Sequence, residues 1–454
     1  MNNSPRRAIV LSAAIVCVCF LLTSTGWLAW EYHLMEQVSP RVSDAMTMVV
    51  GYLLQAAGIG AYALLTRRWS RAAEKAVPAA LLLHTLCLIP AILSKSAAGT
   101  LAAGFLVDLF CGGIAGYYLQ VLTVRVPAER RASALGLGYG VSILASWLLA
   151  KLGGAIYYSS RVWIICFVLT AAALALFRLE QRGKETAAKP QAAAAREDGK
   201  TAERRTLLVT VGVVVLLFSV VNNSGFAFSS ADLVQGIRVE SSRLFYAVGL
   251  ILAGFVMDRE RKYGAAATLA ALMIPFIMLA LRAEPVSLTV FWALSYFTYG
   301  FYSVYRMIVF SDLAEQNALP YLAGFGLLLG RIGDAAGEAV CLALLSSPTV
   351  LIFLTALLFL AAVFLFLRVY RLLYLPETSP EQSERERFYQ FAVQHDLSSR
   401  ERDMLRLLLE EKTNAEIADV LSISENTVKF HIRNLLQKTG CKNRSDLIAV
   451  YQCR

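Results

Sequence analysis

The sequence is poor in charged residues, in histidine and in paired cysteines. Asp, Glu, Lys and Arg make up only 17% of its 454 residues, and only 4 residues are histidine. None of the 8 cysteines forms a C-x-x-C pair, and most lie in apolar runs, which favours small-residue packing over zinc sites or disulfides. We find no Ser/His/Asp, paired-carboxylate or metal-binding pattern. The sequence therefore predicts no enzyme, no metal site and no cofactor.

Apolar residues dominate the composition instead. They make up 57% of the chain, and the mean hydropathy is +0.56, as is typical of an integral membrane protein. The formal net charge is +10, but acidic and basic residues nearly balance between Gln382 and Arg454. The positive excess lies in short loops and in residues 178–205, which fits the positive-inside rule better than a DNA-binding surface.

Twelve apolar runs are long enough to cross a bilayer. The first extends from Ala8 to Trp30, which is too long for the apolar part of a signal peptide, although a cleaved signal stays open as an alternative. Six runs precede the charged, Ala-rich stretch at 178–205, and six follow it. We expect an N-terminal half at 1–177, a flexible cytosolic linker at 178–205 and a C-terminal half at 206–375.

The loops between these runs alternate in positive charge. With the N-terminus inside, the cytosolic loops hold most of the arginines and lysines, among them Arg67, Arg68, Arg130, Arg131 and Arg259. An even number of spans then places both termini in the cytosol, the side that contains DNA. We therefore expect a multi-pass protein of the bacterial cytoplasmic membrane, in contact with membrane lipid.

Residues 397–454 have helical amphipathicity in place of membrane hydropathy. Capping residues predict four helix starts, at Ser398 with Glu401, Thr413 with Glu416, Ser424, and Asn443. The few residues between the second and third helices allow only a tight turn, so we expect a helix-turn-helix. The connector at 376–396 contains Ser379-Pro380, which marks a further helix start.

This segment resembles the LuxR-type helix-turn-helix. The pattern is carried by Leu397-Ser398-Ser399-Arg400-Glu401, Glu416-Ile417-Ala418, Ser424-Glu425-Asn426-Thr427-Val428-Lys429-Phe430-His431, and Asn443-Arg444. Lys412 stands where the family usually has glycine, which asks Lys412 or a neighbour for an unusual backbone turn. Thr439-Gly440-Cys441 replaces the common Leu-Gly-Val and thins one core contact. The resemblance implies a homodimer that pairs through its fourth helix and binds double-stranded promoter DNA.

The outward face of the third helix predicts how DNA is read. Lys429, Phe430 and Arg433 are placed to contact base edges, and the resemblance puts base contacts at the same positions. The remaining polar candidates suit phosphate contacts, which position the domain without reading sequence: Asn426, Thr427, His431, Asn434, Lys438 and Arg444. For Lys438 a solvated surface position is an equal alternative.

The two sets of six spans resemble the major facilitator superfamily. The residues that carry the resemblance are Gly254 to Asp258-Arg259 with Arg261-Lys262, similar to its G-x-x-x-D-R-x-G-R-K loop, and Pro127 to Arg131 followed by Ala134-Leu135-Gly136. The internal glycine of the first motif is missing. The loop with Arg67-Arg68 lacks an aspartate, and in transporters that loop helps to switch between inward-open and outward-open states. This departure argues against transport, not against the fold.

Five charged residues lie within the predicted spans, where charge is costly and indicates function: Asp108, Arg306, Arg331, Asp334 and Glu338. The last three share one helix face. Two interpretations stay open. Either a polar cavity between the halves binds a ligand through an arginine, or Arg331 pairs with Asp334 or Glu338 between helices and Arg306 lies at the cytosolic end. Aromatic residues of the tenth span suit either a ring-bearing ligand or lipid-facing packing.

These observations predict an all-α protein, a membrane-embedded one-component transcription regulator. A transporter-like bundle senses a small-molecule ligand and controls a tethered LuxR-type domain. The alternatives are an active transporter with an appended regulatory DNA-binding domain, and a structural anchor that holds a constitutive repressor at the membrane.

Overall fold

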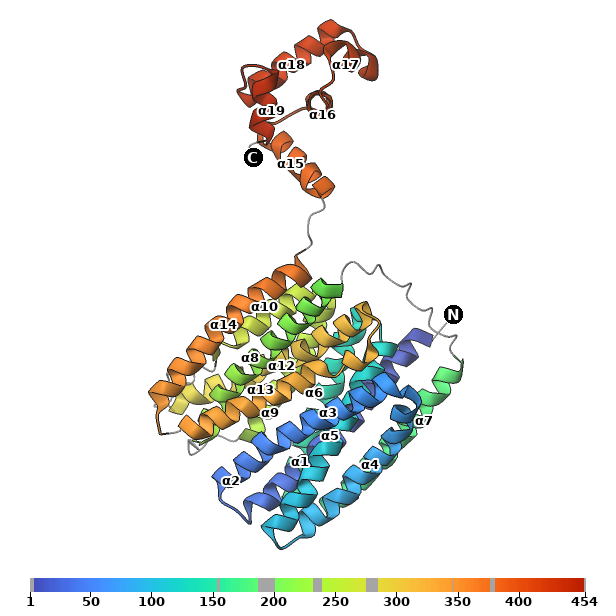
Figure 1. Ribbon diagram of the computed structural model, residues 1–454, viewed down its shortest axis with the longest axis vertical. Coiled ribbons are helices and arrows are strands. Elements are labelled where there is room, and N and C mark those ends of the chain that lie inside the picture. The colour runs from blue at the N-terminus through green and yellow to red at the C-terminus, as the bar shows by residue number, and fades with distance from the viewer. Residues whose placement is uncertain are drawn as a thin grey trace. The chain divides into compact units, whose positions relative to one another are not determined.

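The computed structural model describes residues 4–152, 156–186, 201–231, 239–274, 285–344, 346–375 and 380–452. All regular secondary structure in these ranges is helical, as the sequence predicts. The chain divides into two compact units, Met1–Tyr374 and Leu375–Arg454. The first is a helical bundle, and the second is a small group of short helices (Figure 1).

The first half of the bundle consists of long helices joined by short turns (Figure 1). A π-helical segment, η1, leads directly into α3. The elements are α1 (Ser4–Met35), α2 (Pro40–Asp44), η1 (Ala45–Gly51), α3 (Tyr52–Arg68), α4 (Ser70–Leu93), α5 (Ala97–Arg125), α6 (Ala128–Leu152), η2 (Ile156–Tyr158) and α7 (Val162–Thr186).

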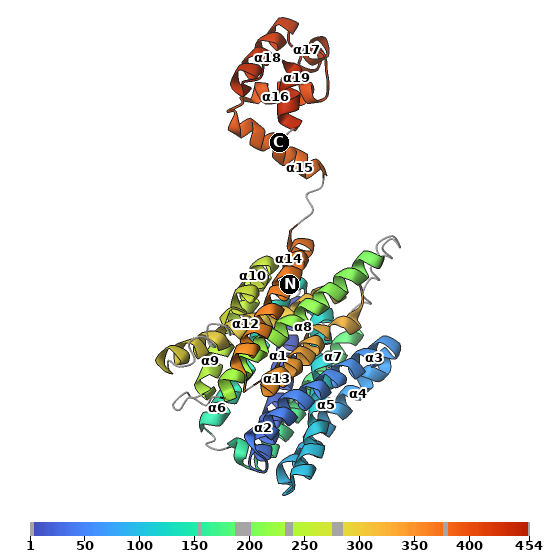
Figure 2. The ribbon, with the colours of Figure 1, turned by 60° about the vertical axis from the view of Figure 1, so that its left-hand side comes forward.

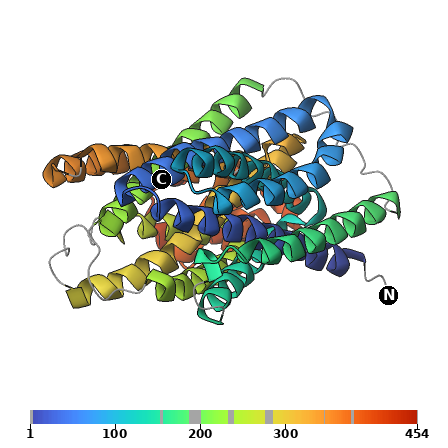
Figure 3. The ribbon, with the colours of Figure 1, turned by 90° about the horizontal axis from the view of Figure 1, so that it is seen from below.

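The second half repeats this arrangement of long helices, and Figures 2 and 3 show the two halves packed side by side. Its elements are α8 (Thr201–Ala231), α9 (Val239–Arg259), α10 (Arg261–Ala271), α12 (Pro285–Gln316), η4 (Pro320–Leu322), α13 (Phe325–Leu344) and α14 (Pro348–Tyr374).

The range predicted as a linker, 178–205, is helical at both of its ends. Helix α7 continues to Thr186 and α8 begins at Thr201, so both ends of that range are helical, and residues 187–200 lie outside the described part. Glu180 explains the extension of α7. Its side chain is 2% exposed and accepts a hydrogen bond from Arg125 Nη2 at 3.1 Å, a tertiary ion pair that composition alone does not reveal.

Eight of the described helical segments are long and apolar enough to cross a membrane: Arg6–Met35, Arg41–Arg68, Ser70–Leu93, Ala97–Arg125, Ala128–Lys151, Val162–Gly183, Arg204–Ser224 and Thr349–Tyr374. Helix α13 is not one of these eight segments, and it carries three charged side chains, Arg331, Asp334 and Glu338. Large apolar side chains such as Phe353 and Phe364 are about three-quarters exposed on the bundle surface, at 74% and 75%. That exposure suits a lipid environment.

The two halves meet where α6 packs against α9. Gly136 of α6 and Gly254 of α9 permit this contact, because a Cβ atom at Gly136 would lie 2.3 Å from the carbonyl oxygen of Leu250. A Cβ at Gly254 would lie 2.6 Å from that of Ala132. Small residues let helix backbones approach closely in this way, so the interface between the halves is tight here.

The C-terminal unit contains the predicted helix-turn-helix. Its helices are α15 (Pro380–Gln394), α16 (Ser399–Leu409), α17 (Asn414–Leu421), α18 (Glu425–Thr439) and α19 (Arg444–Gln452). Both predicted capping boxes form, and Ser424 and Asn443 accept backbone N–H bonds as predicted for the other two starts. The core beneath them includes Leu405, Leu408, Ile417, Val428 and Leu435.

Lys412 stands where the family has glycine, and the strained turn expected there is made by the preceding residue, Glu411. Glu411 has φ of 58°, and the backbone N–H of Lys412 then bonds to the carbonyl of Leu407. A left-handed conformation costs a residue with a side chain about 1 kcal/mol or more. Ser422, in the turn between α17 and α18, is also left-handed, with φ of 53°. The sequence-based prediction of an unusual turn beside Lys412 is confirmed.

Candidate functional site

The outward face of α18 presents the three residues predicted to read bases. Lys429, Phe430 and Arg433 are all exposed, and Phe430 is 60% exposed. Val428 and Leu435 of the same helix are buried. The ring of Phe430 makes an edge contact with that of His431 at 5.6 Å but leaves most of its surface in solvent on an otherwise polar helix face, where it can contact a thymine methyl group.

The first turn of α18 is fixed by its own hydroxyl groups. Ser424 Oγ accepts from the Thr427 backbone N–H at 3.2 Å, and the two hydroxyl groups lie 2.8 Å apart. Asn426 is exposed beside them, and His431 and Asn434 are half-buried. The exposed amides and the positive end of the helix dipole favour an anionic partner such as phosphate at this end.

Lys438 and Arg444 differ from their predicted phosphate-binding role, because both are engaged within the unit. Lys438 Nζ donates to the carboxylate of Glu401 and to the carbonyl of Asp396, both at 2.8 Å. Burial acts to raise the pKa of Glu401, but the bonds from Lys438 and from Ser398 outweigh it and the pKa is lowered. Arg444 donates to the carbonyl oxygens of Lys412 and Leu408 at 2.7 and 3.3 Å. Both side chains therefore tie helices together.

The connector helix α15 packs onto the same core. Phe391 is 5% exposed, and its ring lies 5.4 Å from that of Tyr451 on α19. Sequence reasoning predicted a helix here but not its partner. The pairing of α15 with α19 joins the connector to the helix through which dimerisation was predicted.

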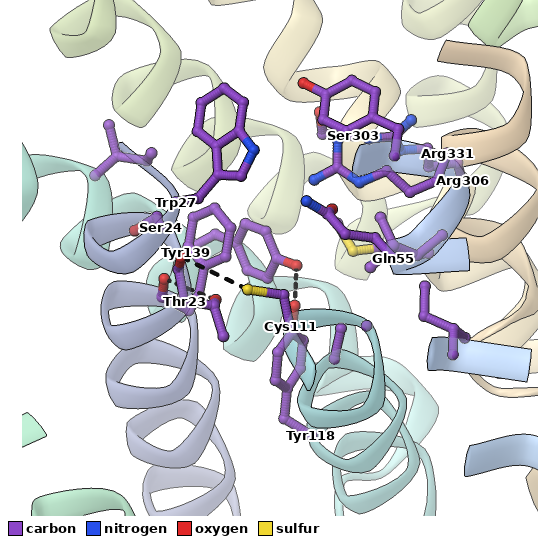
Figure 4. A pocket seen from close by; sticks show the side chains of 18 of the residues that line it. Thr23, Ser24, Trp27, Gln55, Cys111, Tyr118, Tyr139, Ser303, Arg306 and Arg331 are labelled. Carbon is purple, nitrogen blue, oxygen red and sulfur yellow. Dashed lines mark hydrogen bonds between the residues drawn. The ribbon is translucent and has the colours of Figure 1, made fainter. Parts of the chain in front are cut away.

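A cavity of about 290 Å³ lies inside the bundle and is lined by both halves (Figure 4). Its lining includes Thr23, Ser24, Trp27, Gln55 and Cys111 from the first half. Aromatic side chains form much of the wall: Phe20, Trp27, Tyr52, Tyr118, Tyr139, Tyr246, Tyr296 and Tyr299. Among the described lining residues, Arg306 and Arg331 alone are charged, and they lie together on the side of the cavity opposite Trp27 (Figure 4).

Asp334 holds both arginines. Arg306 Nη1 lies 3.0 Å from Asp334 Oδ2, and Arg331 Nη1 lies 3.6 Å from the same atom. The guanidinium of Arg306 also faces the ring of Tyr302 at 5.1 Å, and that of Arg331 faces Tyr52 at 4.3 Å. Arg306 lines the cavity and its side chain is only 4% exposed beside Asp334, a position that suits the first of the two interpretations left open, the polar cavity between the halves. The pair between helices is Arg306 with Asp334.

Asp108 and Glu338 lie outside the cavity lining. Asp108 Oδ1 accepts from Gln55 Nε2 at 2.6 Å, so it stands behind a lining residue, and its side chain faces Gly51 of the π-helical segment. Glu338 accepts from Asn223 Nδ2 at 3.1 Å. Sequence reasoning missed Gln55 and the tyrosines of the first half, for which the available signal was tyrosine within apolar spans. Across the described ranges, no group of three His, Cys, Asp or Glu is placed to hold a metal.

A second cluster of charges joins the halves at the end of the bundle where α6 begins and α12 ends. We call it the inter-half network, and it consists of Arg131, Asp258, Arg261, Asp312 and Glu315. Fully buried Arg131 donates to Asp312 at 2.7 Å and to Glu315 at 2.8 Å. Asp258 accepts the backbone N–H groups of Ala132 and Ser133, both at 2.9 Å. Arg261 Nε donates to Asp312 at 2.8 Å.

Comparison with known proteins bears on each unit separately. Residues 395–451 match the family described as bacterial regulatory proteins, luxR family. Over 52 residues the chain is 50% identical to the spore germination protein GerE of Bacillus subtilis. The aligned residues are 12% of this chain and 70% of GerE. It is 48% identical over 52 residues to the regulatory protein SdiA of Escherichia coli, covering 12% of this chain and 22% of SdiA.

The bundle resembles solved transporters. The human organic anion transporter MFSD10 (TETRAN) aligns with a TM-score of 0.55 and 13% identity, over 79% of this chain and 98% of that one. The nucleoside transporter NupG aligns with a TM-score of 0.51 and 13% identity, over 80% and 99%. At this identity the likeness shows the fold. The bundle has the architecture of major facilitator-type transporters, and through its C-terminal unit the chain belongs to the luxR family of bacterial regulatory proteins.

Proposed function

We propose that the protein is a membrane-embedded transcription regulator, in which the bundle binds a small molecule and thereby controls promoter binding by the C-terminal unit. The observation that carries this proposal is the joining of two parts in one chain. One is a luxR-family unit with an exposed reading face on α18, and the other is a transporter-like bundle with a cavity lined by arginine and aromatic side chains.

At the DNA end, Lys429 and Arg433 donate to guanine O6 and N7, and Phe430 contacts a thymine methyl group. Asn426, Thr427 and the half-buried side chains of α18 contact phosphates. One reading helix covers a half-site, so the unit acts as a homodimer that pairs through α19. Tethering to a membrane raises the effective concentration of a second copy and favours that pairing.

At the membrane end, the bundle lies in the cytoplasmic membrane of a bacterium with both termini in the cytosol. Support comes from the apolar outer surface of the helices and from the arginine-rich ends of α3 and α9. In this orientation the C-terminal unit reaches DNA, and the apolar faces contact lipid.

The DNA-reading role is tested with the full chain in lipid nanodiscs and labelled DNA from the region upstream of its own gene. Lys429→Ala and Arg433→Ala are each expected to weaken specific binding by about tenfold, because each removes donors to a base edge. Arg402→Ala, which removes one exposed charge from α16, is the matched control and keeps wild-type affinity. Unchanged specific binding by both α18 variants would remove α18 from the interface.

An active transporter with an attached DNA-binding unit is the second candidate, because the bundle aligns over nearly the whole length of an organic anion transporter. Uptake of radiolabelled organic anions into proteoliposomes containing the full chain separates the two functions. Accumulation against a gradient would favour transport, whereas equilibrium binding without accumulation favours a sensor.

A further inference from the structure

Among the described residues, the charges that face the bundle cavity are of one sign. Arg306 and Arg331 line it, and the carboxylate that holds them, Asp334, has a side chain that is only 2% exposed and stands outside the lining. A single carboxylate thus serves two guanidinium groups. Gln55 stands between the cavity and Asp108, to which it donates a hydrogen bond. The surface that a ligand meets is therefore cationic.

Arg331 is the less tightly paired and the more exposed of the two arginines. Its contact with Asp334 is long, at 3.6 Å, and its side chain is 20% exposed, against 3.0 Å and 4% for Arg306. The Nε atoms of both arginines are buried without a hydrogen-bond partner in the described structure, so exposure and the distance to Asp334 are what distinguish Arg331. A guanidinium carries five N–H donors in a planar fork that matches a carboxylate with two parallel bonds. Arg331 thus lines the cavity with guanidinium N–H groups that its long contact with Asp334 does not fully occupy.

The cavity walls are suited to a flat, unsaturated group. The rings of Phe20 and Tyr139 are stacked with centroids 3.9 Å apart, and those of Tyr246 and Tyr299 are stacked at 5.2 Å. Trp27 and Tyr52 form a third stacked pair, at 6.3 Å. Aromatic rings add specific attraction for other rings in offset or edge geometry. The volume of about 290 Å³ is at the lower end for small-molecule sites and fits one or two rings.

We propose that this cavity binds a small aromatic monocarboxylate, with the carboxylate on Arg331 and the ring among the stacked side chains. Arg306 remains paired with Asp334 and fixes the wall. Amines are rejected by the two guanidinium groups, and neutral amides bind weakly because they lack the charge that Arg331 requires. The assignment rests on the proposed sensing function, and it names the class of ligand and the residue that selects it.

The test measures thermal unfolding of the full chain in nanodiscs with matched probes. Benzoate and 2-naphthoate are compared with benzamide and 2-naphthamide, and with benzylamine. We expect the acids to raise the unfolding temperature at concentrations about tenfold lower than the amides, and we expect the amine to have no effect. Neither the amides nor the amine can form the charge-assisted pair that a carboxylate forms with Arg331. Amides that match the acids, or no shift with either acid, would overturn the proposal.

Arg331→Gln is expected to abolish the preference for acid over amide while the ring still binds, and Arg331→Lys is expected to keep part of it. Arg41→Gln is the control, since Arg41 is in the bundle but donates to the carbonyl of Leu342 and does not line the cavity. If Arg331→Gln unfolds without probe at a lower temperature than wild type, Arg331→Lys carries the test. A preference as large as that of the wild type, in Arg331→Gln or, where that variant is destabilised, in Arg331→Lys, excludes Arg331.

Promoter binding measured in the same nanodiscs separates this inference from the proposed function. Acids that bind without changing DNA affinity would defeat the regulatory role and leave the ligand class standing. A change in DNA affinity caused by the amine or the amides, and not by the acids, would defeat the ligand class and leave the regulatory role standing.

Discussion

The two halves of the bundle hold equivalent loops in different ways. The loop after α9 is tied to the other half by the inter-half network, in which Asp258 accepts two backbone N–H groups at the start of α6. The loop after α3 has Arg67 in place of such a carboxylate network, and Arg67 faces the ring of Tyr321 at 5.5 Å. One connection is ionic and largely buried, and the other is a cation–π contact.

The two equivalent loops therefore contribute different amounts of free energy to the contact between the halves. Asp258 accepts from the N–H groups of the fifth and sixth residues of α6, Ala132 and Ser133, and a carboxylate near the N-terminal end of a helix also gains from the helix dipole. Arg131 adds two carboxylate partners and two backbone carbonyl partners, those of Thr123 and Val126. A cation–π contact at a partly exposed site contributes about 0.5–1 kcal/mol. The halves are therefore held more strongly at the loop after α9.

The largest effect is expected from Arg131→Gln, which removes the centre of the inter-half network. Four acceptors lose a donor at once, namely Asp312, Glu315 and the carbonyls of Thr123 and Val126, and a buried acceptor left without a donor costs about 1–3 kcal/mol, so we expect a total loss of about 3–5 kcal/mol. The free energy of unfolding in nanodiscs measures this loss. Arg131→Lys keeps the positive charge but lacks the planar guanidinium group, so its stability should lie between that of Arg131→Gln and that of the wild type. An Arg131→Gln protein as stable as wild type would show that the network contributes little.

A smaller effect is expected from Asp258→Asn. The amide can still accept one N–H bond but loses the charge that faces the start of α6, so we expect a loss of about 1–3 kcal/mol. Glu260→Gln is the matched control in the same loop, because Glu260 is exposed and pairs only loosely with Lys262, at 3.5 Å. Equal losses in the two variants would contradict the special position of Asp258.

Tyr321→Leu should cost less, about 0.5–1 kcal/mol, because it removes the ring beneath Arg67 and the edge contact of that ring with Phe325 but no buried charge. Tyr321→Phe retains the ring and should keep wild-type stability. A loss in Tyr321→Leu as large as that in Arg131→Gln would erase the contrast between the loops.

The smallest expected effect is the coupling between the two loops. The double variant Asp258→Asn/Tyr321→Leu should lose the sum of the single losses to within about 0.5 kcal/mol, because the two contacts share no partner residue. Coupling above that value, measured by the same unfolding assay, would show that the loops act as one unit.

The sequence predicts what is decided locally. The capping boxes at Ser398 and Thr413 lie within four consecutive residues each, so their bonds follow from spacing alone. The strained turn at Glu411 was expected because the absence of glycine leaves some neighbour with a positive φ. The family resemblances gave the architecture of both units for a similar reason, since hydropathy and motif spacing are properties of contiguous sequence.

Partner choice between distant segments could not be predicted in the same way. Spacing placed Arg331 and Asp334 on one helix face, but the shorter ion pair is with Arg306 of another helix. Likewise Lys438 and Arg444 are basic residues near the DNA-reading helix, yet they bond to Glu401 and to carbonyl oxygens of α16 and its following turn. The rotation of a helix about its axis depends on tertiary packing, and that rotation decides whether a side chain meets solvent or a neighbour.

The buried position of Arg131 bears on the ligand concentration at which the proposed response would occur. Under the proposed sensing function, a ligand shifts the equilibrium between two states of the bundle only through the difference in its affinity for them. Where the inter-half network holds the halves together in the unliganded state alone, each additional 1.4 kcal/mol, roughly, raises the ligand concentration needed for the response tenfold. A site remote from the cavity can in this way set the threshold of a response. Under the proposed function, substitutions at Arg131, Asp312 or Glu315 would therefore change the ligand concentration at which the protein responds, without changing the residues that recognise the ligand.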